Sequence, residues 1–314
     1  MTGYAPDRPQ IDRYPTRVER AIAPVPRTDP VVWSARGPEP GPLSRDELER
    51  FERDGFLLRP RSVAEEQLAG LRRELERLPA ELSPDDPRVV REGGSGAVRS
   101  VFAPHLCSGL VADVVRSETV LPLARQLLGS DVYLHQARIN FMPGFSGSGF
   151  YWHSDFETWH AEDGLPAIRT VSCSIALTEN YPYNGALMVM PGSHHTFYPC
   201  VGRTPENHHQ SSLVRQEIGV PDQETLAKAA DASGIFQSTG PAGTAFWFDA
   251  NLLHGSGSNI TPFPRSNLFL VFNSVENAPV EPFAAARRRP EHIAARVPEP
   301  IREQEPISQG KRSG

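Results

Sequence analysis

The chain has 314 residues, which is enough for one large domain or two small ones with a sizeable core. Its 32 basic and 38 acidic residues give a formal net charge of −6, which argues against a nucleic-acid partner because phosphate binding needs a basic face. No apolar run is long enough to span a membrane, and the N-terminus lacks the apolar core of a signal peptide. Three scattered cysteines fit a reducing compartment, so we expect a cytoplasmic globular protein without a membrane anchor.

The first third of the chain predicts helices. Residues 1–42 are rich in Pro and Arg, and their composition leaves open whether they form an arm draped over the domain or a mobile tail. Ser44 and Glu47 form a capping box for a helix that Gly55 is expected to end. Ser62 with Glu65 predicts the start of a second helix, in which leucines recur on one face, and a third helix is expected over 119–128, ending at Gly129.

From Val132 onward the hydrophobic period changes to two, which is typical of strands. In residues 132–142, the polar Gln136, Arg138 and Asn140 alternate with apolar residues. Further strands are predicted over 170–177, 186–190, 244–248 and 268–275, punctuated by Gly and Pro. Helices followed by many short strands indicate an α+β protein with a jelly-roll core, expected over residues 43–295. After residue 284 we expect a short helical piece and then, over 296–314, a flexible tail.

The stretch FYWHSDFETWH contains His153 and Asp155 at strand spacing, which places both side chains on one side of a strand. His254, just after a strand of aromatic residues, is a candidate third ligand. Two histidines and one carboxylate on one face of a metal ion leave three coordination positions open, as non-haem iron(II) oxygenases require. A zinc site with the same ligands is the nearest alternative, and residue types alone do not exclude it.

Arg265 follows His254 by eleven residues, at the start of a predicted strand. An arginine there suits a bidentate cosubstrate, because its guanidinium can bind a remote carboxylate while the other end of the molecule chelates iron. Ser256 and Asn267 are placed to add hydrogen bonds to the same cosubstrate, and we expect Asn140 to contact it too. On the substrate side, Arg138 is a candidate donor, and Glu157 shares the strand parity of the metal ligands, so it is expected to face inward, toward a cation or Arg138.

The remaining histidines are weaker candidates. His194 and His195 follow a strand and are predicted to be structural or to support the ligands. His208 and His209 lie in a polar segment and are predicted to be solvated. The residues alone assign no partner to His105, His135 or His160.

The triad and Arg265 resemble the phytanoyl-CoA dioxygenase branch of the 2-oxoglutarate oxygenases, and the surrounding stretches resemble the ectoine hydroxylases within it. The resemblance rests on FYWHSDFETWHAEDGLP, QARINFMPGF, TENYPYNGALMVMPGSHH, QEIGVPD and AFWFDANLLHGSGSN, and it covers nearly the whole chain. It implies a double-stranded β-helix with flanking helices, a homodimer, and the conversion of ectoine, 2-oxoglutarate and O₂ to 5-hydroxyectoine, succinate and CO₂. Roles in osmotic or heat protection follow from it alone.

The same resemblance assigns site residues. It implies that Fe(II) is bound by His153, Asp155 and His254, and 2-oxoglutarate by Arg265, Ser256 and Asn267. It implies that Gln136 and Trp159 contact ectoine, with Phe248 and Phe269 lining the pocket. One departure is Met142, at a position where the family often carries a lysine that touches 2-oxoglutarate.

Three other functions compete with this prediction. A relative within the superfamily could hydroxylate another small polar metabolite, such as an amino acid. A cupin-like module could bind a metal without turnover. A zinc hydrolase could use the same ligands.

Overall fold

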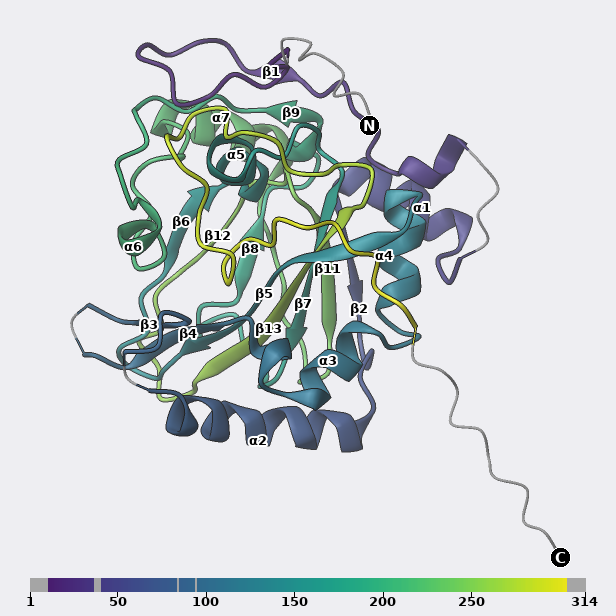
Figure 1. Cartoon of the computed structure of the whole chain (residues 1–314), viewed down its shortest axis with the longest axis vertical. Helices are drawn as coiled ribbons and strands as arrows, with labels where there is room; N and C mark the ends of the chain where they lie inside the picture. Colours follow the sequence, from purple (N-terminus) through teal and green to yellow (C-terminus); the bar gives the residue numbers. More distant parts are fainter. Residues whose placement is uncertain (1–10, 37–40, 84, 94, 304–314) are drawn as a thin grey trace, which may run out of the picture.

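The computed structural model describes residues 11–36, 41–83, 85–93 and 95–303. Three antiparallel sheets carry the fold, and helices lie along one side of the largest sheet (Figure 1). The helical segments are η1 Trp33–Arg36, α1 Arg45–Asp54, α2 Glu65–Glu81, η2 Pro104–Leu106, α3 Gly109–Val115, α4 Leu121–Leu128, α5 Asp155–Thr158, the π-helical η3 Trp159–Asp163, η4 Ser193–His195, α6 His209–Ser212 and α7 Gln223–Ser233.

The strands follow the predicted positions closely, and the predicted strand over 132–142 is confirmed at both ends. Strand order is β2-β11-β7-β13-β5-β4-β3 in the large sheet, β10-β8-β12-β6 in the small sheet, and β1-β9 in a two-stranded ribbon. The strands are β1 Val25–Pro26, β2 Phe56–Arg59, β3 Val89–Arg91, β4 Val98–Phe102, β5 Val132–Met142, β6 Phe150–His153, β7 Thr170–Ala176, β8 Leu187–Val189, β9 Thr196–Phe197, β10 Phe236–Gln237, β11 Ala245–Asp249, β12 His254–Ser256 and β13 Arg265–Ser274.

The helix signals are partly confirmed. The capping box of Ser44 and Glu47 is present, and Gly55, with φ 80°, ends α1 in the left-handed conformation. The predicted cap of the second helix is wrong: Ala64 occupies the N-cap of α2, and the Ser62 hydroxyl instead donates to the carbonyl of Arg59. The third helix is confirmed as α4 and ends at Gly129.

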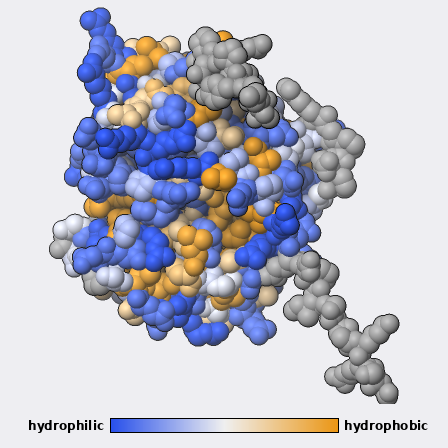
Figure 2. Space-filling view, in the orientation of Figure 1, coloured by the Kyte–Doolittle hydropathy of each residue, from blue (hydrophilic) through white to orange (hydrophobic). Residues whose placement is uncertain are grey.

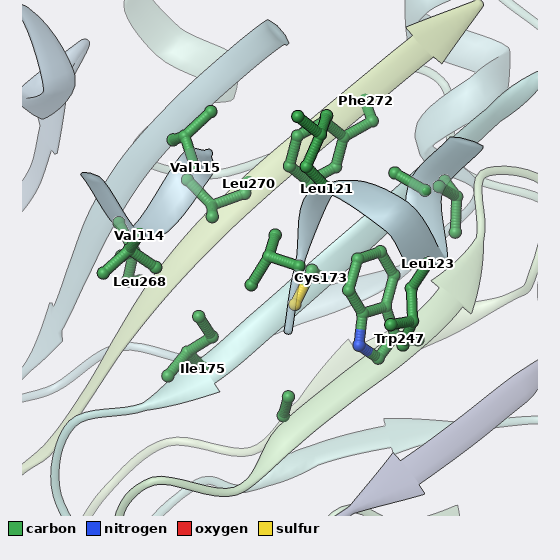
Figure 3. Close-up of a cluster of buried hydrophobic side chains, with 14 of the residues drawn as sticks. Val114, Val115, Leu121, Leu123, Cys173, Ile175, Trp247, Leu268, Leu270 and Phe272 are labelled. Atoms are coloured by element: carbon green, nitrogen blue, oxygen red, sulfur yellow. The ribbon is translucent and has the colours of Figure 1, made fainter. Parts of the chain in front are cut away.

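One face of the large sheet forms the main hydrophobic core against the helices. Its apolar side chains come from alternate positions of the central strands and pack against α3 and α4, as Figure 3 shows for Cys173, Ile175, Trp247, Leu268, Leu270, Phe272, Val114, Val115, Leu121 and Leu123. Because side chains alternate along a strand, the opposite face carries the residues between these positions. That second face lies toward the small sheet and holds the polar groups of the site.

The small sheet brings distant segments together. His254 of β12 is the direct antiparallel partner of His153 at the end of β6, and β12 pairs on its other side with β8. Between the two sheets lies an apolar cluster made of Leu187, Val189, Phe246, Phe248, Leu252 and Phe269. The α+β fold with two facing antiparallel sheets is therefore confirmed.

Both ends of the described chain are tied to the domain. In the N-terminal arm, Tyr14 and Arg17 are buried. After β13 the chain returns across the sheets, where the backbone amides of Ala295 and Ile301 donate to His135 and Val132 (Figure 1). The helical piece expected after residue 284 is wrong, since this segment forms turns and bends. The rest of the predicted tail, 304–314, lies outside the described residues, and the domain limits at 43 and 295 stay predictions.

No helix within the described ranges is long and apolar enough to cross a membrane. On the face shown in Figure 2, hydrophilic and hydrophobic residues are interspersed.

Candidate metal and cosubstrate site

Three ligand side chains converge between the two sheets. His153 ends β6, Asp155 begins α5 and His254 begins β12, and their ligand atoms all lie within 4.8 Å of one another. The Asp155 carboxylate oxygens lie 3.7 Å from Nε2 of His153 and 3.7 Å from Nε2 of His254. All three residues are buried. The predicted spacing brings them together, although Asp155 stands on a helix and not, as expected, on the strand of His153.

The imidazoles are oriented for metal binding. Nδ1 of His153 lies 2.7 Å from the carbonyl oxygen of Tyr151, and Nδ1 of His254 lies 3.0 Å from that of Leu252. A carbonyl only accepts, so each Nδ1 carries the proton and each Nε2 presents its lone pair to the centre. Burial, with a smaller contribution from His153, lowers the pKa of His254 to about 4, so this ring is neutral at neutral pH.

The carboxylate of the triad is ionised. Burial alone would raise the pKa of Asp155, but the polar and charged groups around it, Arg138 among them, hold it well below its ordinary value. A carboxylate with two imidazoles is the donor set that a divalent first-row metal ion such as iron prefers. The residues present therefore fit iron.

Arg265 lies close by with its charge uncompensated. It is buried, and no carboxylate in the described chain forms an ion pair with it; its contact is a weak one, from Nη2 to the thioether sulfur of Met142 at 3.5 Å. Its Nε has no partner there either. Burial, and then the charge of Arg99, lowers the pKa of Arg265 to about 10, so it remains a cation. A buried cation of this kind is costly without an anion, which indicates a site for an anionic ligand.

A small cavity joins the two features. Its walls include seven of the predicted residues: His153, His254, Arg265, Ser256, Asn140, Phe269 and Arg138. The guanidinium carbon of Arg138 lies 5.0 Å from the centre of the Phe269 ring. Met142, Phe150 and Leu187 complete much of the apolar wall. A larger surface groove lies next to the cavity and shares Ser148, Phe150 and Ser256 with it.

Four other predicted residues lie behind this wall. Gln136 is buried between the carbonyl of Ile293 and Nη1 of Arg138, at 2.9 and 2.8 Å. Trp159 packs against His135, and the Phe248 ring lies 5.1 Å from that of His254. Asn267 donates to the hydroxyl of Ser174 and leaves its own carbonyl oxygen without a partner among the described residues.

The prediction for Glu157 is wrong. It does not continue the strand toward Arg138, because α5 begins at Asp155 and turns its side chain away to the N-terminal arm. There it accepts hydrogen bonds from Nε and Nη2 of Arg17 at 2.6 and 2.9 Å and from the hydroxyl of Thr16 at 2.7 Å. The buried carboxylate is fully occupied, so we do not propose it as an ectoine contact.

Glu157 belongs to a buried ionic cluster that also explains several histidines. Glu162 binds Arg17 and His208, and Asp163 binds Arg289 and His135. The expectation that His208 is solvated is therefore wrong. His160 lies buried between Asp12 and the carbonyl of Leu165, while His194, buried beside the carbonyl of Glu52, is structural as predicted.

Sequence reasoning missed Arg99, which lines the same cavity as Arg265. Arg99 stands on β4, far from the motif of the metal ligands, and reaches the cavity because β4 pairs with β5. No local pattern in the sequence marks it, since the pairing of these two strands has no signature of its own.

Comparisons with known proteins agree with this geometry. The family model described as phytanoyl-CoA dioxygenase (PhyH) matches residues 51–267. An ectoine dioxygenase of Nocardia farcinica is 58% identical over 91% of this chain and 94% of its own length. One from Streptomyces avermitilis is 56% identical, over 93% of this chain and 98% of its own.

Solved structures of related proteins share the fold. EctD from S. alaskensis with 2-oxoglutarate and 5-hydroxyectoine has a TM-score of 0.84 at 42% identity, covering 94% of this chain and 98% of that one. The same protein with bound Fe has a TM-score of 0.82 and the same coverage. The chain therefore belongs to the phytanoyl-CoA dioxygenase family and, within it, to the ectoine dioxygenases.

Proposed function

We propose that this protein is an Fe(II)- and 2-oxoglutarate-dependent dioxygenase that hydroxylates ectoine to 5-hydroxyectoine and releases succinate and CO₂. The observation that carries the chemistry is the buried His153–Asp155–His254 triad at a cavity that Arg265 also lines, a cation with no carboxylate partner among the described residues. The choice of ectoine rests on the high identity to ectoine dioxygenases along most of the chain.

The residue roles are part of this proposal. His153, Asp155 and His254 bind Fe(II), which together with 2-oxoglutarate supplies the oxidative chemistry that places one oxygen atom of O₂ on a ring carbon. Arg265 binds the distal carboxylate of 2-oxoglutarate, helped by Ser256 and Asn140, which line the cavity, and by Asn267 beside it. For ectoine, a small zwitterion, Arg138 supplies a cation for the carboxylate and Phe269 an aromatic face for the amidinium.

We propose that Gln136, Trp159 and Phe248 act indirectly, by holding residues of the cavity wall and of the metal site in place. Gln136 holds Arg138 by a hydrogen bond to its guanidinium, and Phe248 packs on the ring of His254. Trp159 follows the helix of Asp155 and fixes it against His135. The chain thus orients both molecules and limits access of water to the metal, because the triad is buried between the sheets.

The direct test supplies the protein with Fe(II), 2-oxoglutarate, O₂ and ectoine and follows the products by NMR. We expect hydroxyectoine and an equal amount of ectoine-dependent succinate. A panel of amino acids and other small polar metabolites tests the substrate, since turnover of one of these without turnover of ectoine would replace the assignment. No succinate with any substrate would indicate a non-catalytic metal-binding module. Zinc found after anaerobic purification would indicate a hydrolase.

We further propose a cytoplasmic homodimer whose product protects against osmotic stress. The compartment is supported by Cys107, Cys173 and Cys200, which are all free thiols. The dimer and the protective role are supported by the family resemblance. Light scattering in solution tests the dimer, cell fractionation tests the compartment, and growth of a deletion strain at high osmolarity tests the role.

A further inference from the structure

Three arginines line the cavity, and the proposed function uses Arg265 and Arg138 but not Arg99. Arg265 of β13 and Arg99 of β4 come from the two strands that flank β5, and both line the cavity. Met142, the register partner of Arg265, stands between these strands without a charge. Arg99 is close enough for its charge to lower the pKa of Arg265, as two cations do when they share a poorly solvated space.

Arg99 is held rigidly. Nη1 donates to Glu92 at 2.6 Å and to the carbonyl of Ser148 at 3.0 Å, and Nε donates to the carbonyl of Leu213 at 3.1 Å. Nη2 makes a longer contact, 3.4 Å to the carbonyl of Gly149, so one of its two N–H groups is left without a described partner. The side chains of Arg99 and Glu92 are both about 95% buried, at 6% and 5% exposure. The guanidinium is therefore a fixed charge and not a mobile surface group.

Charge counting shows what this arrangement favours. Arg265 and Arg99 contribute two positive charges, and Glu92 compensates one of them, which leaves an excess of one positive charge at this wall. The third lining arginine, Arg138, does not add to this excess, because the carboxylate of Asp155 balances its charge. A neutral side chain at Met142 neither adds to this excess nor reduces it. In a poorly solvated cavity, such an excess favours a ligand with a carboxylate at this position over one of the same shape without it.

We propose that Arg99 is a specificity-determining residue for the cosubstrate: its charge, reduced by Glu92, acts with Arg265 to select 2-oxo acids that carry a distal carboxylate. This inference rests on the proposed function, because it assigns the cavity to a 2-oxo acid bound beside the metal. Glu92 then sets the strength of selection, and the two residues of one ion pair have opposite effects on it.

The test compares 2-oxoglutarate with 2-oxopentanoate, in which a methyl group replaces the distal carboxylate. Each acid is titrated by calorimetry into the Fe(II)-loaded protein under nitrogen, so that binding is measured without turnover. The preference is the Kd of 2-oxopentanoate divided by the Kd of 2-oxoglutarate. For Arg99→Gln we expect this ratio to fall by roughly five- to tenfold, because only the Kd of 2-oxoglutarate rises. For Glu92→Gln we expect the preference to rise by about threefold, since the isosteric amide removes the compensating charge. Arg215→Gln, a surface variant whose side chain is 83% exposed, should leave it unchanged.

The opposite effects expected for Arg99→Gln and Glu92→Gln distinguish a role in cosubstrate selection from a purely structural role. If both variants weaken both acids equally, the pair is a structural brace and the inference is wrong. Should Arg99→Gln not fold, Glu92→Gln decides by itself: an unchanged or reduced preference overturns the inference. Equal binding of the two acids by the unaltered protein would overturn the 2-oxoglutarate assignment, and the inference with it. A preference in the unaltered protein that Arg99→Gln leaves intact would remove Arg99 and keep the proposed function.

Discussion

Two groups of buried charges lie within this fold, and they differ in how well their members are paired. In the ionic cluster at the N-terminal arm, Arg17 is bound by two carboxylates, and Asp163 is bound by Arg289 and His135. In the cavity, Arg265 has no carboxylate among the described residues, and the Nε2 atoms of His153 and His254 face a shared centre.

The comparison gives a criterion for deciding whether a buried charged residue serves the fold or binds a ligand. Burying a charge is costly, so a charge whose partners come from the chain itself serves the fold. A charge or lone pair left without such a partner is tolerated where a ligand supplies one. By this criterion, Glu157 belongs to the fold and Arg265 to the site, although Glu157 stands two residues from a metal ligand.

The largest expected effect is on the triad. His153→Ala or Asp155→Ala removes one of three metal ligands, and we expect turnover of ectoine to fall by at least about 10³-fold, with loss of bound iron. Metal analysis and NMR product assays measure both. His195→Ala, at an exposed histidine, is the matched control. Full activity in either triad variant would remove that residue from the iron site.

The second-largest effect is expected in the buried ionic cluster at the N-terminal arm. Arg17→Met leaves Glu157 buried without its cation and Glu162 with His208 as its remaining partner, and we expect the free energy of unfolding to drop by about 3–5 kcal/mol. Urea unfolding measures it. Arg203→Met breaks an exposed ion pair with Glu19 and should change stability by less than about 1 kcal/mol. Similar losses in the two variants would mean that the buried pairing does not support the fold.

Arg265→Met should behave in the opposite way. Because the cation has no carboxylate partner in the described chain, we expect stability without ligands to stay within about 1 kcal/mol of the original or to increase. The Kd of 2-oxoglutarate should rise by roughly 10- to 100-fold, as loss of a charge-assisted bidentate contact predicts. Unfolding and anaerobic titration on the same preparation measure both. A large loss of stability would place Arg265 with the structural charges.

The smallest effect concerns pH. The pKa of His254 is about 4 in the folded protein, below its ordinary value of 6.5, so between these values the unfolded chain binds more protons. This contribution to stability is therefore present above pH 6.5 and is lost as the pH falls toward 4. From pH 7 to pH 5, metal-free protein should lose roughly 2 kcal/mol more than its His254→Gln variant. Between pH 7 and pH 8 the free energy of unfolding of the two proteins should change with pH to the same extent. If it also changes equally between pH 7 and pH 5, the lowered pKa of His254 is contradicted.

Much of this site can be predicted from sequence because its signals are local. The spacing of His153 and Asp155, and of His254 and Arg265, lies within short segments, and the alternation in β5 places Arg138 and Asn140 on one face. Glu157 shows the limit of such reasoning. Parity holds only while the strand continues, and the chain turns into a helix at Asp155. Its true partner, Arg17, lies 140 positions away. Arg99 and His208 were likewise missed because sheet pairing and burial, not neighbouring residues, fix their surroundings.

The register of β6 and β12 has a consequence for folding. His153 and His254 become neighbours only when two strands about a hundred residues apart pair in the correct register, and a shift by one residue would turn one imidazole to the other face. Closing a loop of that length is slow relative to local structure formation. The full three-ligand site therefore requires this pairing, and we expect a newly made chain to bind iron tightly only once its two sheets have closed.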